Sequence, residues 1–346
     1  MQKSLHHAGY LLIVPGGLES LACAEALDLS PGATAVPAGP DLPGRVRVGA
    51  PPTWAWRQAR LATRVAREIG EVPADDLGCF RAAVGSLELP ELETTSGFRV
   101  TAHAAPGAGL GLQEAAQAAG GVLHDRHGTP VRLRDFDLEV RLDLGAERAL
   151  VSVELHREPL DRRMKRARNL RSALKPTLAA GLIRLAGAHR DGGSLLDPTC
   201  GSGTIAVEAK SGNPSLGVCA SDWDEATTDV ARGTLRNHGL EVDVRRADAR
   251  ELWPAWERRF DSIVCNPPYG VKVGRGARID LLYASMLSSM VEVLEPGGRI
   301  VILTPRRRAL ERAACGAGLE VLEALPVQAG ELQPVAHRLG LARALT

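Results

Sequence analysis

The sequence predicts an α/β protein in which an N-terminal α+β region precedes a Rossmann-like domain built on a seven-stranded, doubly wound sheet. From residue 172 onward, short apolar segments alternate with segments of helical spacing, as in a parallel sheet with crossover helices. One of these units combines a strand, a two-glycine turn and a helix start. A length of 346 residues allows roughly two domains, each with its own core.

The N-terminal region contains a mixture of predicted elements. Apolar runs and apolar–polar alternation predict strands at 10–14, 45–48, 98–103, 138–142 and 149–155. Helical spacing predicts helices at 18–27, 54–69 and 113–119. We expect a ferredoxin-like piece over residues 1–70 and a second α/β piece over residues 71–158.

The C-terminal region begins with a helix predicted over 172–189. Strands are predicted at 193–197, 216–221, 242–246, 260–265 and 298–304, with helices at 204–210, 224–238 and 279–294. The segments 319–325 and 336–342 predict a final antiparallel hairpin. We therefore place the Rossmann-like domain at residues 176–346, after a basic linker over residues 159–175.

A candidate cofactor site follows the first of these strands, which ends at Asp197. The next residues include Gly201 and Gly203, and glycines at a helix N-terminus let the backbone approach a ligand. The second strand ends at Asp222, close to the roughly 20-residue spacing at which an acid meets ribose hydroxyls. Position 206 is alanine, so the third glycine of a dinucleotide pattern is missing, which disfavours NAD. Taken alone, the turn could also be an ordinary strand-to-helix connection.

A second motif, Asn266-Pro267-Pro268-Tyr269, follows the strand predicted at 260–265. Two prolines fix φ and remove two N–H donors, so this loop is rigid and presents carbonyl groups. The Asn266 side-chain oxygen and the Pro267 carbonyl can accept from one amino group, while the Tyr269 ring can stack on a base taken out of its helix. Two acceptors that draw an aromatic amine toward tetrahedral geometry free its lone pair to attack a methyl group. The alternative is a proline-kinked loop with a packed tyrosine.

Together, the two motifs resemble those of class I S-adenosylmethionine (SAM)-dependent RNA guanine-N2 methyltransferases with an N-terminal THUMP domain. The resemblance covers about residues 172–304. It implies a THUMP-like RNA-binding domain over residues 71–158 and a catalytic loop formed by Asn266, Pro267, Pro268 and Tyr269. It implies that SAM is held by Pro176, Thr177, Asp197, Thr199, Cys200, Gly201, Ser202, Gly203, Thr204, Asp222, Trp223, Asp248, Ala249 and Asn266. In the family, the segment around Pro176 closes over the methionine end of SAM, and the acid matching Asp248 lies near the adenine.

A basic run precedes the Rossmann-like domain, opposed only by Glu158 and Asp161. We expect these residues of the run to contact RNA phosphates: Arg157, Arg162, Arg163, Lys165, Arg166, Arg168 and Arg171. A solvated linker is the alternative, since most charge runs face solvent. The arginines at 306–308 extend this patch or start an exposed helix. Family members often carry a His-Arg-Arg-Gly-Tyr-like stretch where this chain has His156-Arg157-Glu158-Pro159-Leu160. This difference lies in the link to the RNA-binding region, so it bears on which RNA is the substrate more than on the reaction.

The resemblance implies methylation of tRNA, with guanosine 6 of the acceptor stem as the nearest precedent. A guanine-N2 methyltransferase of 23S ribosomal RNA remains an alternative. DNA adenine-N6 methylases share the loop motif but usually carry a separate DNA-recognition domain. The N-terminal strands argue against the all-helical N-terminal domain of release-factor glutamine methyltransferases. Intact Asn266 and Asp197 argue against a non-catalytic RNA-binding protein.

Composition limits the remaining possibilities. The formal net charge of +1 does not by itself indicate a nucleic-acid partner. The six cysteines lack metal-binding spacing, so we expect no metal site and a reduced, cytoplasmic protein. No apolar run of 18 residues is present, so we expect no membrane partner. We expect a monomer whose partner is a structured RNA, namely tRNA.

Overall fold

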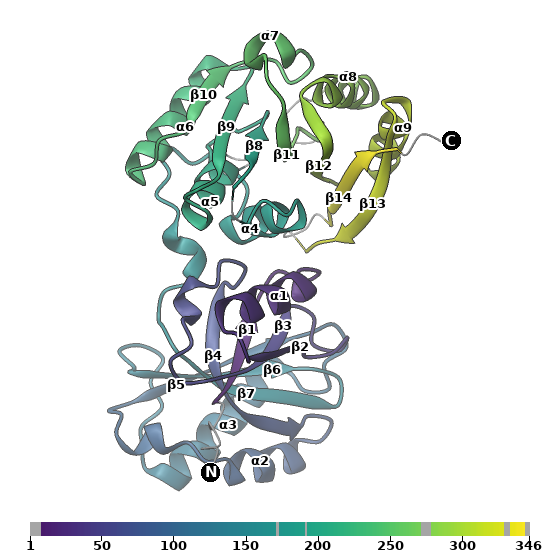
Figure 1. Ribbon diagram of the computed structural model, residues 1–346. Coiled ribbons are helices and arrows are strands. Elements are labelled where there is room, and N and C mark those ends of the chain that lie inside the picture. The colour runs from purple at the N-terminus through teal and green to yellow at the C-terminus, as the bar shows by residue number, and fades with distance from the viewer. Residues whose placement is uncertain (1–7, 171–172, 191, 271–277, 329–332, 343–346) are drawn as a thin grey trace, which may run out of the picture. The chain divides into compact units, whose positions relative to one another are not determined.

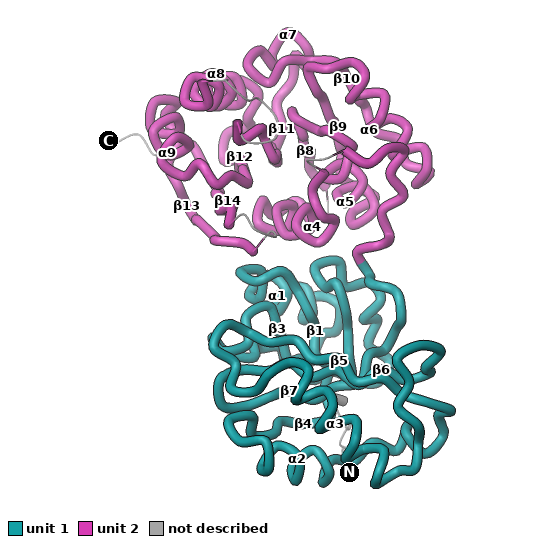
Figure 2. Tube along the Cα trace, turned by 180° about the vertical axis from the view of Figure 1, so that it is seen from behind, with its two compact units in different colours: residues 1–160 teal, residues 161–346 magenta. Residues whose placement is uncertain are grey.

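The computed structural model describes residues 8–170, 173–190, 192–270, 278–328 and 333–342. The chain divides into two compact units, residues 1–160 and residues 161–346 (Figure 2). Each unit is built on one seven-stranded sheet (Figure 1). The predicted class, a Rossmann-like domain preceded by an α+β region, is confirmed. None of the helices in these ranges has both the length and the apolar character needed to cross a membrane.

The sheet of the second unit has the strand order β10-β9-β8-β11-β12-β14-β13. Its strands are β8 (Ser194–Asp197), β9 (Gly217–Asp222), β10 (Asp243–Arg246), β11 (Phe260–Cys265), β12 (Leu294–Thr304), β13 (Leu319–Pro326) and β14 (Val335–Leu341). The first five pair in parallel, and β14 pairs antiparallel with both β12 and β13. Every strand predicted from residue 193 onward forms, within a few residues of its predicted bounds.

The topological switch point of this sheet lies between β8 and β11. From β8 the chain moves to β9 and β10 on one side, and it returns through β11 and β12 on the other. Leu195 pairs with Ser262 and Leu196 with Ile263, so the carboxyl ends of β8 and β11 lie at nearly the same level. Ligands of doubly wound folds bind at such a point, beyond the carboxyl ends of the strands.

The helices of this unit are α4 (Pro176–Leu185), α5 (Thr204–Gly212), α6 (Glu225–Asn237), α7 (Trp253–Trp256), α8 (Ile279–Glu292) and α9 (Arg307–Gly316). The helix predicted over 172–189 is shorter than expected and starts at Pro176, where a proline loses no helical hydrogen bond. Helix α6 starts where the Asp224 carboxylate accepts from the Thr227 N–H at 3.2 Å. Helices α4 and α5 pack together, as do α8 and α9.

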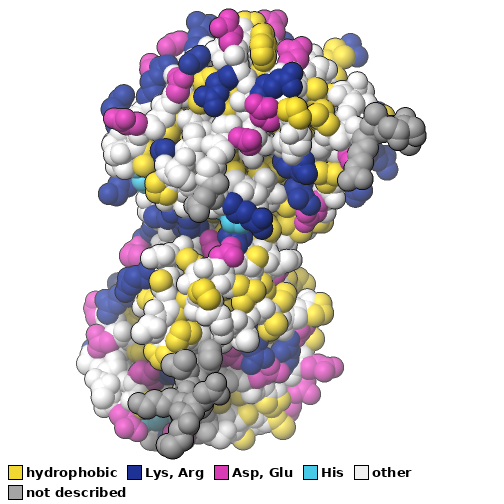
Figure 3. Space-filling view, viewed as in Figure 1, with side chains coloured by type: hydrophobic (Ala, Val, Ile, Leu, Met, Phe, Trp, Pro, Cys, Tyr) yellow, Lys and Arg dark blue, Asp and Glu magenta, His cyan; other side chains and the backbone are white. Residues whose placement is uncertain are grey.

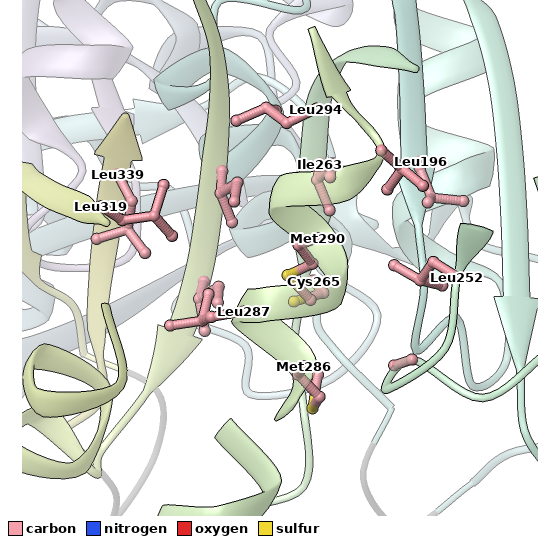
Figure 4. Close-up of a cluster of buried hydrophobic side chains, with 14 of the residues drawn as sticks. Leu196, Leu252, Ile263, Cys265, Met286, Leu287, Met290, Leu294, Leu319 and Leu339 are labelled. Atoms are coloured by element: carbon pink, nitrogen blue, oxygen red, sulfur yellow. The ribbon is translucent and has the colours of Figure 1, made fainter. Parts of the chain in front are cut away.

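The hydrophobic core of the second unit lies between the sheet and α8. Figure 4 shows Met286, Leu287 and Met290 of α8 near Ile263 and Cys265 of β11. All five side chains are buried. Because this packing fixes β11 up to its last residue, it also fixes the start of the loop that follows.

The sheet of the first unit has the order β2-β3-β1-β4-β7-β6-β5, and only β5 and β6 pair in parallel. Its strands are β1 (Ala8–Ile13), β2 (Thr34–Pro37), β3 (Arg45–Ala50), β4 (Arg64–Pro73), β5 (Phe98–Ala104), β6 (Leu138–Leu144) and β7 (Arg148–Glu154). The helices are α1 (Glu19–Leu29), α2 (Leu77–Ser86) and α3 (Leu112–His127). Strand β2 and helix α2 were not predicted, and α3 is longer than predicted.

The helix predicted over 54–69 is wrong. This segment contains a short 3₁₀ helix, Trp56–Gln58, followed by β4. Strand β4 pairs with β1 along one edge and with β7 along the other, so it is a central strand whose partners lie far away in sequence. The boundary expected between residues 70 and 71 falls inside β4, which means that the two expected N-terminal pieces share one sheet.

A buried ionic network lies on the face of this sheet opposite α2 and α3. Val140, Leu142 and Leu144 of β6 pack with those helices, so the alternating Arg141 and Asp143 point to the other face. The Asp143 carboxylate accepts from Arg141 Nε at 2.7 Å and from an Arg45 nitrogen at 2.6 Å. Burial opposes ionisation of Asp143, but Arg141 and Arg45 outweigh it and hold its pKa below the usual range.

We predict that Asp143→Asn lowers the free energy of unfolding by about 3–5 kcal/mol, because it removes the closer of the two carboxylates paired with the buried Arg141 and leaves only the 3.3 Å pair with Glu154. Urea unfolding of the full chain measures this loss. Folding lowers the pKa of the Asp143 carboxyl, so its ionisation stabilises the fold at every pH above the unfolded-state pKa of about 3.9. This stabilisation disappears as the pH falls through the lower pKa of the folded state. The difference between wild type and variant should therefore shrink below about pH 4.

Glu88→Gln, which breaks the exposed pair with Arg126, is the control and should cost less than about 1 kcal/mol. Equal losses in both variants would contradict the prediction.

Candidate active site

The turn after β8 leaves an open surface for a ligand. Gly201 and Gly203 have φ values of 52° and 82°, in the left-handed region that favours glycine. A Cβ placed on Gly201 would meet no atom within 4 Å, so this side of the turn is open. The Cys200 N–H donates to the Ser221 carbonyl at 2.8 Å, which ties the turn to the end of β9.

Two acids stand behind this turn, as the sequence predicted. Asp197 is buried, and its Oδ1 accepts from the Thr199 N–H at 3.2 Å. Asp222 Oδ2 accepts from the Gly201 N–H at 3.1 Å, and its Oδ1 accepts from the Asp224 N–H at 3.2 Å. Burial raises the pKa of Asp222, and it raises the pKa of Asp197 well above the usual range. Each carboxylate oxygen can accept more than one hydrogen bond, so Asp222 can hold the turn and still accept from a ligand.

Helix α4 contributes a buried polar group next to α5. Pro176 and Thr177 are both buried, and Thr177 Oγ1 has no hydrogen-bond partner among the residues that the structure describes. A buried hydroxyl without a partner costs about 1–3 kcal/mol, so a polar ligand group here would be stabilised. Together with the open glycine turn, this fits the amino-acid end of SAM.

The remaining residues of the expected cofactor site differ in exposure. Trp223 follows Asp222 directly, and 71% of its surface is exposed. Ala249 is buried, and the Ala247 N–H donates to the Asp222 carbonyl at 3.0 Å, which joins this segment to β9. Asp248 forms hydrogen bonds with Arg250, 2.9 Å from its Nε and 2.5 Å from its Nη2. An adenine contact by Asp248 therefore competes with Arg250.

The loop Asn266–Tyr269 begins immediately beyond β11 and is partly buried. The Tyr269 hydroxyl donates to Asn266 Oδ1. Burial raises the pKa of Tyr269, so the hydroxyl keeps its proton at neutral pH. An amide oxygen has two lone pairs, which leaves Asn266 one acceptor site for a substrate amino group. The Tyr269 hydroxyl thus orients Asn266, a contact that the sequence did not predict.

Three residues hold this loop from behind, and the sequence had singled out only Arg306 among them, as part of the basic patch or of an exposed helix start. The Tyr283 hydroxyl, from α8, donates to the Pro268 carbonyl at 3.3 Å and lies 2.8 Å from Thr304 Oγ1. Arg306 Nε donates to the Tyr269 carbonyl at 3.1 Å, and the Arg306 N–H donates to Thr304 Oγ1 at 3.0 Å. Burial raises the pKa of Tyr283 to about 12, so it stays a donor at neutral pH. The only signal in the sequence was position: Thr304 and Arg306 lie at the carboxyl end of the strand beside β11.

The basic run divides into side chains with different surroundings. Arg157 lies over the Phe136 ring and donates to its carbonyl, and Arg163 forms an ion pair with the buried Glu208. Arg166 contacts Leu174 and Thr204 in the second unit. The exposed members are Arg157, Arg162, Lys165 and Arg168, while Arg171 lies outside the described residues. On the face shown in Figure 3, basic and acidic side chains are mixed.

The chain is similar to known methyltransferases. A model of the RMKL-like methyltransferase domain matches residues 163–334. The chain is 37% identical over 327 residues to the tRNA (guanine(6)-N2)-methyltransferase of Thermus thermophilus, covering 92% of this chain and 95% of that protein. It is 33% identical over 141 residues to the tRNA (guanine(10)-N2)-dimethyltransferase of Methanothermobacter thermautotrophicus, covering 40% of each chain.

The crystal structure of TrmN from Thermus thermophilus matches with a TM-score of 0.80 at 36% identity, over 97% of this chain and 100% of that one. The match spans both units of the chain. The similarity over nearly the whole length shows that this chain belongs to the methyltransferase family of the Thermus tRNA (guanine(6)-N2)-methyltransferase.

Proposed function

We propose that this protein transfers a methyl group from SAM to the exocyclic N2 amino group of a guanosine in tRNA, guanosine 6 of the acceptor stem. One observation carries the proposal: the acceptor loop after β11 and the glycine turn after β8 leave adjacent strand ends at the switch point of one sheet. Amino group and cofactor would therefore meet at one place. The choice of guanosine 6 is supported by the name of the relative that matches almost the whole chain.

SAM, when bound, supplies a methyl group on a positively charged sulfur. The Asp222 carboxylate would accept from the ribose hydroxyls, and Pro176 and Thr177 would contact the methionine end. The floor of the site would be formed by the backbone of the turn after β8, namely Asp197, Thr199, Cys200, Gly201, Ser202, Gly203 and Thr204. Trp223, Asp248 and Ala249 would surround the adenine.

The catalytic loop would act by positioning. Asn266 Oδ1 and the Pro267 carbonyl would accept the two N–H groups of the guanine amine and hold the nitrogen lone pair out of conjugation with the ring. The nitrogen then forms a bond to the methyl carbon as the carbon–sulfur bond breaks, and the surplus proton leaves to solvent afterwards. No strong base is required, and residues 266–269 carry no charged side chain.

The first unit would supply RNA recognition, with the ferredoxin-like part over residues 1–70, the THUMP-like part over residues 71–158 and the linker over residues 159–175. We further propose that the protein acts as a cytoplasmic monomer with tRNA as its partner. Within the linker, the exposed Lys165 and Arg168 are the best candidates for phosphate contacts.

The direct test is mass analysis of nucleosides from unmodified tRNA incubated with protein and SAM, followed by mapping of the modified position. We expect N2-methylguanosine at position 6. The Asn266→Ala variant should bind SAM and tRNA normally but lose about 100-fold or more in kcat, comparable to removing one oxyanion-hole donor. Methylation of ribosomal RNA or DNA in preference to tRNA would overturn the substrate, and a near-normal single-turnover rate for Asn266→Ala would overturn the mechanism.

We predict that Tyr283→Phe lowers kcat roughly 2- to 10-fold and leaves SAM affinity unchanged. The variant loses one hydrogen bond to the Pro268 carbonyl, which is worth about 0.5–1.5 kcal/mol. Steady-state kinetics on tRNA measure the effect. Tyr10→Phe, in the core of the first unit, is the matched control and should leave kcat unchanged. Equal kcat values for Tyr283→Phe and wild type would show that the loop does not need this support.

We predict that the double variant Lys165→Gln/Arg168→Gln weakens binding of all tRNAs alike and reduces the salt slope of binding by up to about 2, because each phosphate contact contributes about 0.7–0.9 to that slope. Filter binding across a salt series gives the slope. The control, Lys210→Gln/Arg190→Gln, removes the same charge outside the run. Identical slopes in both double variants would mean that total charge, rather than these two positions, determines binding.

A further inference from the structure

Arg166 differs from its neighbour Arg163 in what surrounds its guanidinium. Arg163 is paired with Glu208, whose two carboxylate oxygens lie 3.0 Å from its Nε and Nη2. Arg166 Nη2 donates to the Leu174 carbonyl at 2.7 Å and lies 3.3 Å from Thr204 Oγ1. Its Nε is buried and has no hydrogen-bond partner within the described ranges, and no carboxylate there lies within ion-pair distance of it. Glu208 and Asp161 act on Arg166 electrostatically, so it is a half-buried cation with acids nearby but with no direct ion pair among the described residues.

The position of this guanidinium links it to the cofactor site. Thr204 is the first residue of α5 and follows the glycine turn directly, while Leu174 lies two residues before the start of α4. The same helix α4 carries the buried, unpartnered hydroxyl of Thr177. Two donors without acceptors, Arg166 Nε and the Thr177 hydroxyl, are thus associated with the N-terminal ends of α4 and α5, which pack together. The N-termini of these helices add partial positive charge.

The chemistry that fits these donors is a carboxylate. A buried anion needs charged or strongly polar donors, and a guanidinium provides them in a fixed, planar arrangement. The amino-acid end of SAM carries such a carboxylate. Asp197 and Asp222, which stand behind the glycine turn, would repel it wherever they are ionised.

On the basis of the proposed SAM chemistry, we infer that Arg166 binds the α-carboxylate at the methionine end of SAM, with the Thr177 hydroxyl as a second donor. Arg166 then belongs to the cofactor site and not to the phosphate-binding residues among which the sequence placed it. This assignment makes the segment that precedes α4 in the second unit part of the cofactor pocket.

Two ligands separate this role from a structural one. S-adenosylhomocysteine contains the carboxylate, whereas 5′-methylthioadenosine keeps the adenosine and the sulfur but lacks the amino-acid group. Isothermal titration calorimetry on the full chain should show that Arg166→Gln weakens S-adenosylhomocysteine binding roughly 10- to 100-fold and leaves methylthioadenosine binding unchanged. Arg166→Lys should recover part of the loss, because it restores the charge without the planar donors.

Two further variants serve as controls. Arg190→Gln removes an exposed arginine elsewhere in the unit and should bind both ligands as wild type does. Lys175→Gln removes the lysine at the N-terminus of α4, and a selective loss of S-adenosylhomocysteine binding in that variant instead would overturn the assignment to Arg166. Equal weakening of both ligands by Arg166→Gln would also overturn it, since that result indicates support of the fold. Failure of the wild-type protein to bind S-adenosylhomocysteine would instead overturn the proposed cofactor.

Discussion

The parallel pairing of β8 with β11 is the constraint on which the active site depends. Two segments separated by more than sixty residues end side by side only because Leu195 and Leu196 pair with Ser262 and Ile263. A shift of one residue along this pairing would turn every side chain of β11 to the other face of the sheet. The packing of Ile263 and Cys265 against α8 resists such a shift, so the core and the catalytic geometry depend on the same contacts.

Rigidity of the catalytic loop comes from two sources. Pro267 and Pro268 restrict the backbone internally, but they leave carbonyl groups without intrinsic partners. Tyr283 and Arg306 donate to two of these carbonyls from outside the loop. A loop held in this way would lose little entropy on binding a ligand, because its remaining acceptors already have a fixed direction.

Local sequence signals predicted the second unit better than the first. Strands of a doubly wound sheet are short apolar segments with helices between them, so each one is visible in its own stretch of sequence. Strand β4 was missed because its charged residues face ionic partners on other strands, and its spacing resembles that of a helix. The support of the catalytic loop was missed for a related reason: the roles of Tyr283 and Arg306 depend on contacts that form only when β11 and β12 lie together.

The basic run shows the limit of charge as a sequence signal. Its arginines are chemically identical in the sequence, yet Arg163 is paired with a buried glutamate and Arg166 reaches the start of α5. A guanidinium paired as Arg163 is gains little from a phosphate, because it would first have to give up its carboxylate partner. Only the solvated members of the run keep the counterions whose release drives RNA binding. The linker thus combines two electrostatic tasks: its inward arginines fix it to the methyltransferase unit, and its outward residues remain available to RNA.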